Sequence, residues 1–351
     1  DVAVMGDTVL IGEEVFSLRT ERADAVMGEV PPVERTVFRF TNTTLTGGSG
    51  VALALPAAYT AEDVARMVSR LSPAVRRSLS RMRPEDAGRI VEMSERMRAS
   101  SPATTVEGYA LPASMGGATV GGGIGESVVC TGEIIGVGSG RTTFRGYVTE
   151  ADGTRRPVAL VMLTHSMGGT FHSEALNLSR LAEAGVGEVR FDGLVRIDGR
   201  QALVVNLAEG TPHVGLGDLS VRDRADFNPL MARDLARMAI AGYTSGAGTD
   251  FQYIWGRDAR GRPRLQWIDT ESSVLPIDGA RTAALRERLG RETLTAQDWY
   301  LENLRGFGLY NPETGRFADG VPHTFQDALR FEPSASRPRG ERSSTLPPPP
   351  S

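Results

Sequence analysis

The sequence predicts an α+β fold in two domains within 351 residues. Some stretches alternate apolar and polar side chains as strands do, and others repeat apolar residues every three or four positions as helices do. A glycine-rich run, residues 114–125, separates an N-terminal part from the rest and has the composition of a flexible linker. A hydrophobic share of 40% is enough to bury a core.

Composition limits the classes of function. A net charge of −4 argues against a dedicated nucleic-acid binder, which needs a basic surface. No apolar run approaches the roughly 20 residues that span a bilayer, and residues 1–10 lack the features of a signal peptide. We therefore expect a soluble protein, cytoplasmic unless it is secreted or translocated. The single cysteine, Cys130, excludes an internal disulfide and a cysteine-based zinc site, and its apolar neighbours predict a buried thiol.

All 39 basic residues are arginine. Lysine and arginine are both good helix formers and both keep a protein surface solvated, so the fold gains little from the exclusion of lysine. Lysine alone carries an amine open to ubiquitin attachment or acylation. One interpretation is codon bias. The other is a protein that avoids lysine modification, such as a bacterial effector or toxin acting on a protein in a eukaryotic host, or an enzyme that would otherwise modify its own amines.

Residues 1–113 are predicted to form a small mixed α+β domain. Alternating patterns indicate short strands over residues 9–11, 15–18 and 36–40. Thr60 and Asp63 have the spacing of a capping box, so a helix is expected to begin at Thr60. Another is expected from Pro84, where the acidic first turn suits the helix dipole.

A hairpin with a glycine-rich loop follows the linker. The loop contains Gly136, Gly138, Ser139 and Gly140, and a turn at residues 151–153 leads into a third strand, 158–163. Glycines between strands let the backbone approach phosphate groups closely. A helix from about Phe171 to Ala184, which carries Glu174, and two strands that end near Leu207 complete this stretch.

Residues 132–210 resemble the N-lobe of protein kinases. Ile135-Gly136-Val137-Gly138-Ser139 resembles the start of the glycine loop, although the third glycine of the family falls on Arg141. Val158-Ala159-Leu160 resembles the strand that ends in the ATP-gripping lysine, which falls on Val161. Glu174 resembles the glutamate that pairs with that lysine, and the segment from Leu203 to Gly210, which includes Glu209, resembles the hinge that holds adenine. A valine cannot neutralise phosphate charge or pair with Glu174.

The resemblance implies a bilobal domain over residues 126–333, with an N-lobe at 126–210 and a C-lobe at 211–333. It implies ATP and Mg²⁺ as cofactors. The nucleotide would be contacted by Gly136, Gly138, Ser139, Gly140, Glu174 and Glu209.

The C-terminal half adds candidate acidic residues. Asn228-Pro229 is expected to start a helix. Two short strands then present Asp250 and Gln252 near the first strand and Asp269 at the end of the second. In the kinase resemblance, Asp250 and Asp269 are catalytic, and Asp269 with Gln252 holds the metal, although the usual His-Arg-Asp spacing is absent. Helices are expected around residues 285–289 and from Thr295. The proline-rich tail, residues 334–351, is expected to be disordered.

Three functions remain open. The first is an atypical kinase-like, nucleotide-dependent transferase that modifies a protein. The second is a pseudokinase that binds protein partners without catalysis. The third is a serine esterase of the α/β-hydrolase type, because Thr164 to Gly169 resembles a nucleophile elbow with Ser166 as nucleophile and His323 downstream. The first glycine of that elbow is replaced by Thr164, and a doubly wound fold needs helices between parallel strands.

Overall fold

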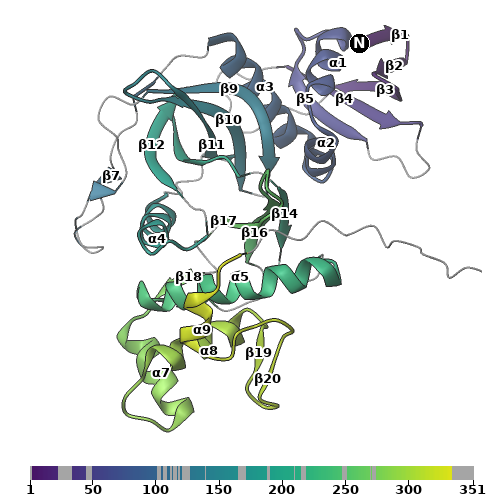
Figure 1. The fold of residues 1–351 in the computed structure, drawn as a ribbon. Helices are drawn as coiled ribbons and strands as arrows, with labels where there is room; N and C mark the ends of the chain where they lie inside the picture. The colour runs from purple at the N-terminus through teal and green to yellow at the C-terminus, as the bar shows by residue number, and fades with distance from the viewer. Residues whose placement is uncertain are drawn as a thin grey trace, which may run out of the picture. The chain divides into compact units, whose positions relative to one another are not determined.

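The computed structural model describes most of the chain, which divides into two compact units (Figure 1). The described residues are 2–22, 34–44, 50–100, 104–105, 109–110, 113, 117, 119–120, 127–138, 140–164, 171–187, 190–208, 210–214, 219–246, 251–268, 270 and 274–333. Unit 1 comprises Asp1–Ala175 and Phe191–Leu207, and unit 2 comprises Leu176–Arg190 and Ala208–Ser351. Both contain helices and antiparallel sheets, so the predicted α+β class is confirmed.

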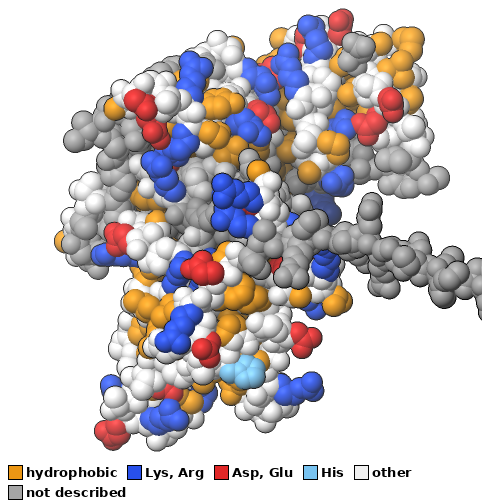
Figure 2. Space-filling model, viewed as in Figure 1, with side chains coloured by type: hydrophobic (Ala, Val, Ile, Leu, Met, Phe, Trp, Pro, Cys, Tyr) orange, Lys and Arg blue, Asp and Glu red, His pale blue; other side chains and the backbone are white. Residues whose placement is uncertain are grey.

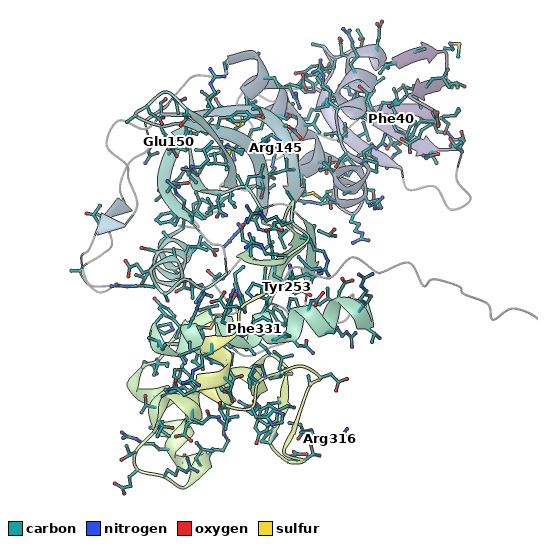
Figure 3. The ribbon with its side chains drawn as sticks, in the orientation of Figure 1. Phe40, Arg145, Glu150, Tyr253, Arg316 and Phe331 are labelled. Carbon is teal, nitrogen blue, oxygen red and sulfur yellow. The ribbon has the colours of Figure 1, made fainter. Side chains whose placement is uncertain are left out.

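Unit 1 begins with a five-stranded antiparallel sheet in which each strand pairs with the next. Its strands are β1 (Val2–Met5), β2 (Thr8–Ile11), β3 (Glu14–Arg22), β4 (Arg35–Asn42) and β5 (Val51–Pro56). In β4, Phe38 and Phe40 are buried and Arg39 between them is exposed (Phe40 is labelled in Figure 3). Because side chains of a strand alternate between its faces, this pattern confirms the predicted strands.

The second sheet of unit 1 has six strands in the order β12-β13-β11-β10-β9-β6. They are β6 (Thr104–Thr105), β9 (Ser127–Val137), β10 (Arg141–Thr149), β11 (Arg155–Leu163), β12 (Phe191–Ile197) and β13 (Arg200–Asn206). The helix α4 (His172–Glu183) follows β11 in the chain. The order of three strands, a helix and two strands therefore agrees with the prediction. Figure 3 labels Arg145 on β10 and Glu150 just beyond its end.

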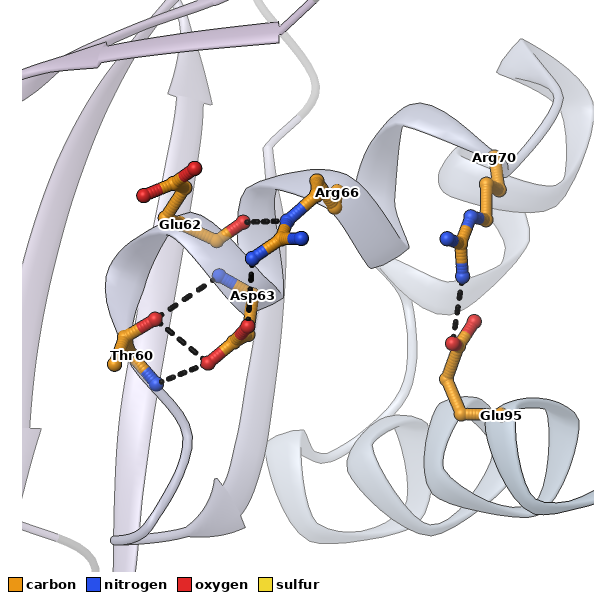
Figure 4. Close-up of polar contacts among 6 residues, drawn as sticks. All are labelled: Thr60, Glu62, Asp63, Arg66, Arg70 and Glu95. Carbon is orange, nitrogen blue, oxygen red and sulfur yellow. Dashed lines mark hydrogen bonds and ion pairs between the residues drawn. The ribbon is translucent and has the colours of Figure 1, made fainter. Parts of the chain in front are cut away.

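Three helices follow β5, namely α1 (Ala61–Ser69), α2 (Pro73–Leu79) and α3 (Pro84–Ser100). The predicted capping box of α1 is present (Figure 4). The Asp63 amide donates to the Thr60 hydroxyl at 3.2 Å, and the Thr60 amide donates to the Asp63 carboxylate at 3.0 Å. Both bonds satisfy amides that a helix start leaves open. Beyond the other end of α1, Arg70 pairs with Glu95 of α3 at 2.6 Å.

The helix α3 contacts both sheets of unit 1, through β5 and β9. Its buried methionines belong to one hydrophobic cluster that includes side chains from the two sheets. Cys130 lies in this cluster with 2% of its surface exposed, and its Sγ is 3.3 Å from Sδ of Met97. The predicted buried thiol is confirmed, and burial raises the pKa of Cys130, which keeps it in the unreactive protonated form.

The helix α5 (Val221–Ile240) of unit 2 begins earlier than predicted. The expected start at Asn228-Pro229 was wrong, because Pro229 lies inside the helix. The actual cap is Ser220, whose hydroxyl accepts a hydrogen bond from the Asp223 amide at 3.1 Å. A proline in a helix interior removes a hydrogen bond, but burial of the surrounding apolar face offsets this cost.

Among its described residues, the rest of unit 2 consists of small sheets and short helices. The strands form one three-stranded sheet, β14 (Thr211–Val214), β16 (Gln252–Arg257) and β17 (Pro263–Ile268), and two pairs, β15 (Tyr243–Ser245) with β18 (Val274–Pro276) and β19 (Tyr310–Asn311) with β20 (Arg316–Phe317). The helices are α7 (Gly279–Leu289), α8 (Ala296–Gly306) and α9 (Phe325–Arg330). The predicted helices near 285–289 and after Thr295 are confirmed.

Aromatic side chains fill the core of unit 2. Phe251 contacts Phe307 edge-on with ring centroids 4.8 Å apart, and Trp267 contacts the same ring at 5.2 Å. Tyr253, labelled in Figure 3, packs against Phe227 of α5 at 4.7 Å. All five are buried, so these rings tie the sheet of β16 and β17 to the helices of the unit.

Two predicted segments fall largely or wholly outside the described residues. Within the predicted linker, 114–125, β8 (Thr119–Val120) pairs with β7 (Tyr109–Ala110) in an antiparallel arrangement, and most of the remainder is outside the described residues. The predicted disordered tail, 334–351, lies outside them entirely.

Candidate functional site

The turn between β9 and β10 is the centre of the candidate site. We call residues 136–141 the glycine turn. The Gly138 amide donates to the carbonyl of Arg141 at 2.8 Å, and the Thr164 amide donates to the carbonyl of Gly140 at 2.9 Å. Below the turn, the buried hydroxyls of Thr142 and Thr164 lie 3.0 Å apart. The ends of the turn are thus fixed to β10 and to the end of β11.

The glycines of this turn are not required by the fold. Gly136, Gly138 and Gly140 do not have left-handed backbone conformations. A Cβ atom at Gly136 would meet nothing closer than 3.6 Å, at Gly138 nothing closer than 3.7 Å, and at Gly140 nothing within 4 Å. By contrast, a Cβ at Gly146 of β10 would lie 2.8 Å from a backbone oxygen, so the fold itself demands glycine there. Packing therefore does not explain why Gly136, Gly138 and Gly140 lack side chains, which favours a role for these positions in ligand binding.

A buried ion pair adjoins the turn. Nη1 of Arg141 lies 3.1 Å from Oε2 of Glu174, whose side chain is 3% exposed, whereas that of Arg141 is 20% exposed. The guanidinium also lies over the ring of Phe171, 5.8 Å from its centroid. Both contacts orient a cation that remains partly accessible. The sequence singled out Glu174 but predicted no cation to pair with it.

Val161 occupies the predicted position of the missing lysine. It lies on β11 directly opposite Thr143 of β10, which in turn lies opposite Gly136 of β9. Directly opposed residues point to the same face of a sheet, so these three side-chain positions share one face. Arg141 lies two residues from Thr143 on the same strand and therefore points to that face as well.

Several predicted site residues fall outside the described part of the chain. They are Ser139, Glu209, Asp250, Asp269 and Ser166. Gln252 is described and lies at the start of β16, opposite Ile268 of β17. Among the described residues, no group of three or more His, Cys, Asp or Glu side chains is placed to hold a metal ion. Of the predicted nucleotide contacts, the structure brings together Gly138, Gly140 and Glu174 around Arg141.

A second buried acid, Asp234 of α5, was not predicted from the sequence. Its side chain is 0% exposed, and its Oδ2 accepts a hydrogen bond from Nε1 of Trp267 at 3.1 Å. Arg233 lies 3.6 Å from Oδ1, which has no hydrogen-bond partner among the described residues. Burial raises the pKa of Asp234 to about 6, although Arg233, Trp267 and the Gly187 amide partly oppose this shift. The sequence carried no signal for it, because an acid within a helix is usually exposed.

The strand before the proposed nucleophile elbow, β11, lies in an antiparallel part of the sheet. The strand pairs with β10 and β13, and both pairings are antiparallel. The elbow of an α/β-hydrolase follows a strand of a doubly wound, mostly parallel sheet. Ser166 lies outside the described residues, and His323 lies between β20 and α9 in unit 2. This geometry does not favour the esterase interpretation.

A surface depression in unit 1 is lined by residues outside the glycine turn. It has a volume of about 360 Å³ and is lined by Ala58, Tyr59, Asp63, Arg66, Met67, Arg70 and Glu95. Its two arginines are paired, Arg66 with Asp63 at 2.9 Å and Arg70 with Glu95 at 2.6 Å (Figure 4). Since these charges already compensate one another, the depression is a weaker candidate for a ligand site than the glycine turn.

Comparisons with known proteins assign no family to this chain. Neither the protein-family models nor the curated proteins include a match to it. No helix within the described residues is long and apolar enough to cross a membrane. In the view of Figure 2, blue arginine side chains are interspersed with acidic, apolar and other side chains, which agrees with the slightly negative net charge.

Proposed function

We propose that this chain binds a nucleotide at the glycine turn and acts as an atypical, protein-kinase-like transferase that modifies another protein. The observation that carries the proposal is a turn of three glycines that the fold does not require. Phosphate groups approach a backbone closely only where side chains are absent. The order of β9, β10, β11, α4, β12 and β13, with Glu174 on α4, supports the same proposal.

The proposed roles of the residues follow from that site. ATP bound with Mg²⁺ would supply the group to be transferred. Gly136, Gly138 and Gly140 would let backbone amides approach its phosphates, and Ser139 and Glu209 are proposed as further contacts. Asp269 and Gln252 are proposed to hold the metal, and Asp250 to accept a proton from the hydroxyl of the substrate. The absence of lysine supports action on a protein of a eukaryotic host, where lysine modification marks proteins for degradation.

A non-catalytic pseudokinase is the second candidate. The observation that favours it is Val161, an apolar residue at the place where a kinase carries its phosphate-binding lysine. Such a protein would bind a partner, and any nucleotide would act as a structural ligand. The two candidates differ in turnover, since only a transferase consumes the bound ATP.

Thermal unfolding in the presence of millimolar ATP with Mg²⁺ or Mn²⁺ tests the proposed site. We expect the melting temperature of the wild type to rise, because a ligand that binds only the native state stabilises it by about 2.7 kcal/mol at a hundred times its dissociation constant. In Gly138→Val, we expect this shift to be lost, because the added side chain stands where phosphates would approach. The nucleotide-free variant should melt near the wild type, since the space around Gly138 is open.

Gly279→Ala is the matched control for this experiment. Gly279 begins α7 in unit 2, and a Cβ there meets nothing within 4 Å. This variant should retain the full nucleotide-dependent shift. A wild type that is not stabilised by millimolar nucleotide, or a Gly138→Val variant stabilised as much as the wild type, would rule out the glycine turn as the binding site.

A further inference from the structure

We propose that Arg141 supplies, from β10, the cation that contacts the phosphates of the nucleotide, in place of the lysine that β11 lacks. This inference rests on the proposed function and adds the residue that recognises the phosphates. It also explains how a chain with Val161 and no lysine could still bind a polyphosphate.

Arg141 points to the face of the sheet that also carries Val161. Arg141 lies opposite Leu163, and Val161 lies two residues before Leu163 on β11. Arg141 and Val161 are therefore diagonal neighbours on adjacent strands. The Cα atoms of such neighbours are typically roughly 7–8 Å apart. An arginine side chain is long enough to span that distance. Its guanidinium can thus reach the space that the amine of a lysine at position 161 would occupy.

The pairing of Arg141 matches the requirement for a phosphate-binding cation. In kinases, the lysine is held by a glutamate of the following helix while it contacts the phosphates. Here Glu174 of α4 lies 3.1 Å from the guanidinium and is 3% exposed, whereas Arg141 is 20% exposed. The acid is thus buried and the cation reaches the surface. A guanidinium has five N–H donors in a planar fork, so it can bind a carboxylate and a phosphate together.

The backbone of Arg141 is part of the glycine turn itself. Its carbonyl accepts the hydrogen bond from the Gly138 amide at 2.8 Å. The cation is therefore fixed to the segment whose glycines leave room for a ligand. The Phe171 ring, 5.8 Å from the guanidinium carbon, limits its motion on another side. A cation held by several contacts loses little conformational entropy when it binds phosphate.

The lysine-free sequence makes a direct test possible, because one introduced lysine adds the only side-chain amine. We would treat Arg141→Lys with an acyl-phosphate derivative of ATP. The amine attacks the acyl carbon, an amide forms at the lysine, the bond between acyl carbon and phosphate oxygen breaks, and ATP leaves. We expect peptide mass spectrometry to find the label at position 141, and an excess of unmodified ATP to reduce it at least about tenfold, because both ligands compete for one site.

Arg145→Lys is the matched control. Arg145 lies on the same strand and face as Arg141, about 13 Å further along, and pairs with Glu133 at 2.8 Å. We expect no ATP-competed label there. Equal labelling of both variants would overturn the inference, because the probe would then react with any amine on β10.

A second variant keeps the inference testable if lysine does not fit the site. In calorimetry with Mg²⁺ and ATP, Arg141→Gln should lose affinity by about ten- to a hundredfold, the usual effect of losing a charge-assisted hydrogen bond. If the wild type binds ATP and Arg141→Gln binds it equally well, Arg141 is not the phosphate contact but the proposed function stands. If the wild type does not bind ATP, the proposed function fails as well.

Discussion

Replacing Gly88 with alanine is expected to destabilise unit 1 by about 3 kcal/mol. This is opposite to the usual result, because alanine in the middle of a helix is normally more stable than glycine by about 1 kcal/mol. Gly88 lies in α3, and a Cβ atom there would stand 2.1 Å from the carbonyl oxygen of Ala54 on β5. The three nearest atoms all belong to the backbone of Ala54, so the helix and the sheet would have to separate. The cost of that separation exceeds the gain in helix propensity.

Urea unfolding measures this effect. The unfolding free energy of the wild type and of Gly88→Ala should fall with urea concentration at a similar slope, since the surface exposed on unfolding hardly changes. The urea concentration at the midpoint of unfolding should be clearly lower for Gly88→Ala. Gly279→Ala serves as the control, because Gly279 is also helical but has open space around it. Its stability should stay within about 0.5 kcal/mol of the wild type. A Gly88→Ala protein as stable as the wild type would mean that α3 does not approach β5 this closely.

Asp234→Asn is expected to stabilise the protein at pH 7.5 but not at pH 4. Burial raises the pKa of Asp234 from 3.8 to about 6. Between these two values the folded state binds a proton that the unfolded state has released, so the contribution of Asp234 to stability is lost as the pH rises through this window. Two pKa units correspond to about 3 kcal/mol. Asparagine has no charge to bury, and its carbonyl oxygen can still accept the hydrogen bond from Trp267.

The test compares the unfolding free energies of the wild type and Asp234→Asn at both pH values. The other titrating groups are the same in both proteins, so their effects cancel when the difference between variant and wild type at pH 4 is subtracted from that at pH 7.5. We expect the variant to gain up to about 3 kcal/mol relative to the wild type between pH 4 and pH 7.5. A difference that is the same at both pH values would show that Asp234 is not the titrating group.

Local sequence patterns predicted much of the fold. The capping box at Thr60, the helix start near Thr295 and the alternating strands are short-range signals, so each could be predicted without knowledge of the partner segments. The start of α5 was misjudged because Asn228-Pro229 is a typical helix start, and burial of the flanking apolar residues overrode it. The contacts of α3 with two sheets depend on tertiary packing, which periodicity does not encode.

The candidate site could be predicted in part. The glycine-rich loop and Glu174 were found because their residue types and order are visible in the chain. The pairing of Glu174 with Arg141 could not be predicted, because the kinase resemblance implies a cation at position 161 of β11, whereas the cation paired with Glu174 lies on β10. Asp234 was missed because burial, which raises its pKa, is a property of the packed structure. Asp250 and Asp269 remain predictions.

Hydrogen–deuterium exchange with and without Mg²⁺ and ATP tests the central claim, that a nucleotide binds at the glycine turn. The account predicts slower exchange in peptides that cover residues 136–141, because bound phosphates would accept hydrogen bonds from their amides. Peptides from β2 and β3 in the other sheet of unit 1 should exchange at the same rate in both samples. Binding of ATP that leaves residues 136–141 unprotected, while another segment is protected, would contradict it.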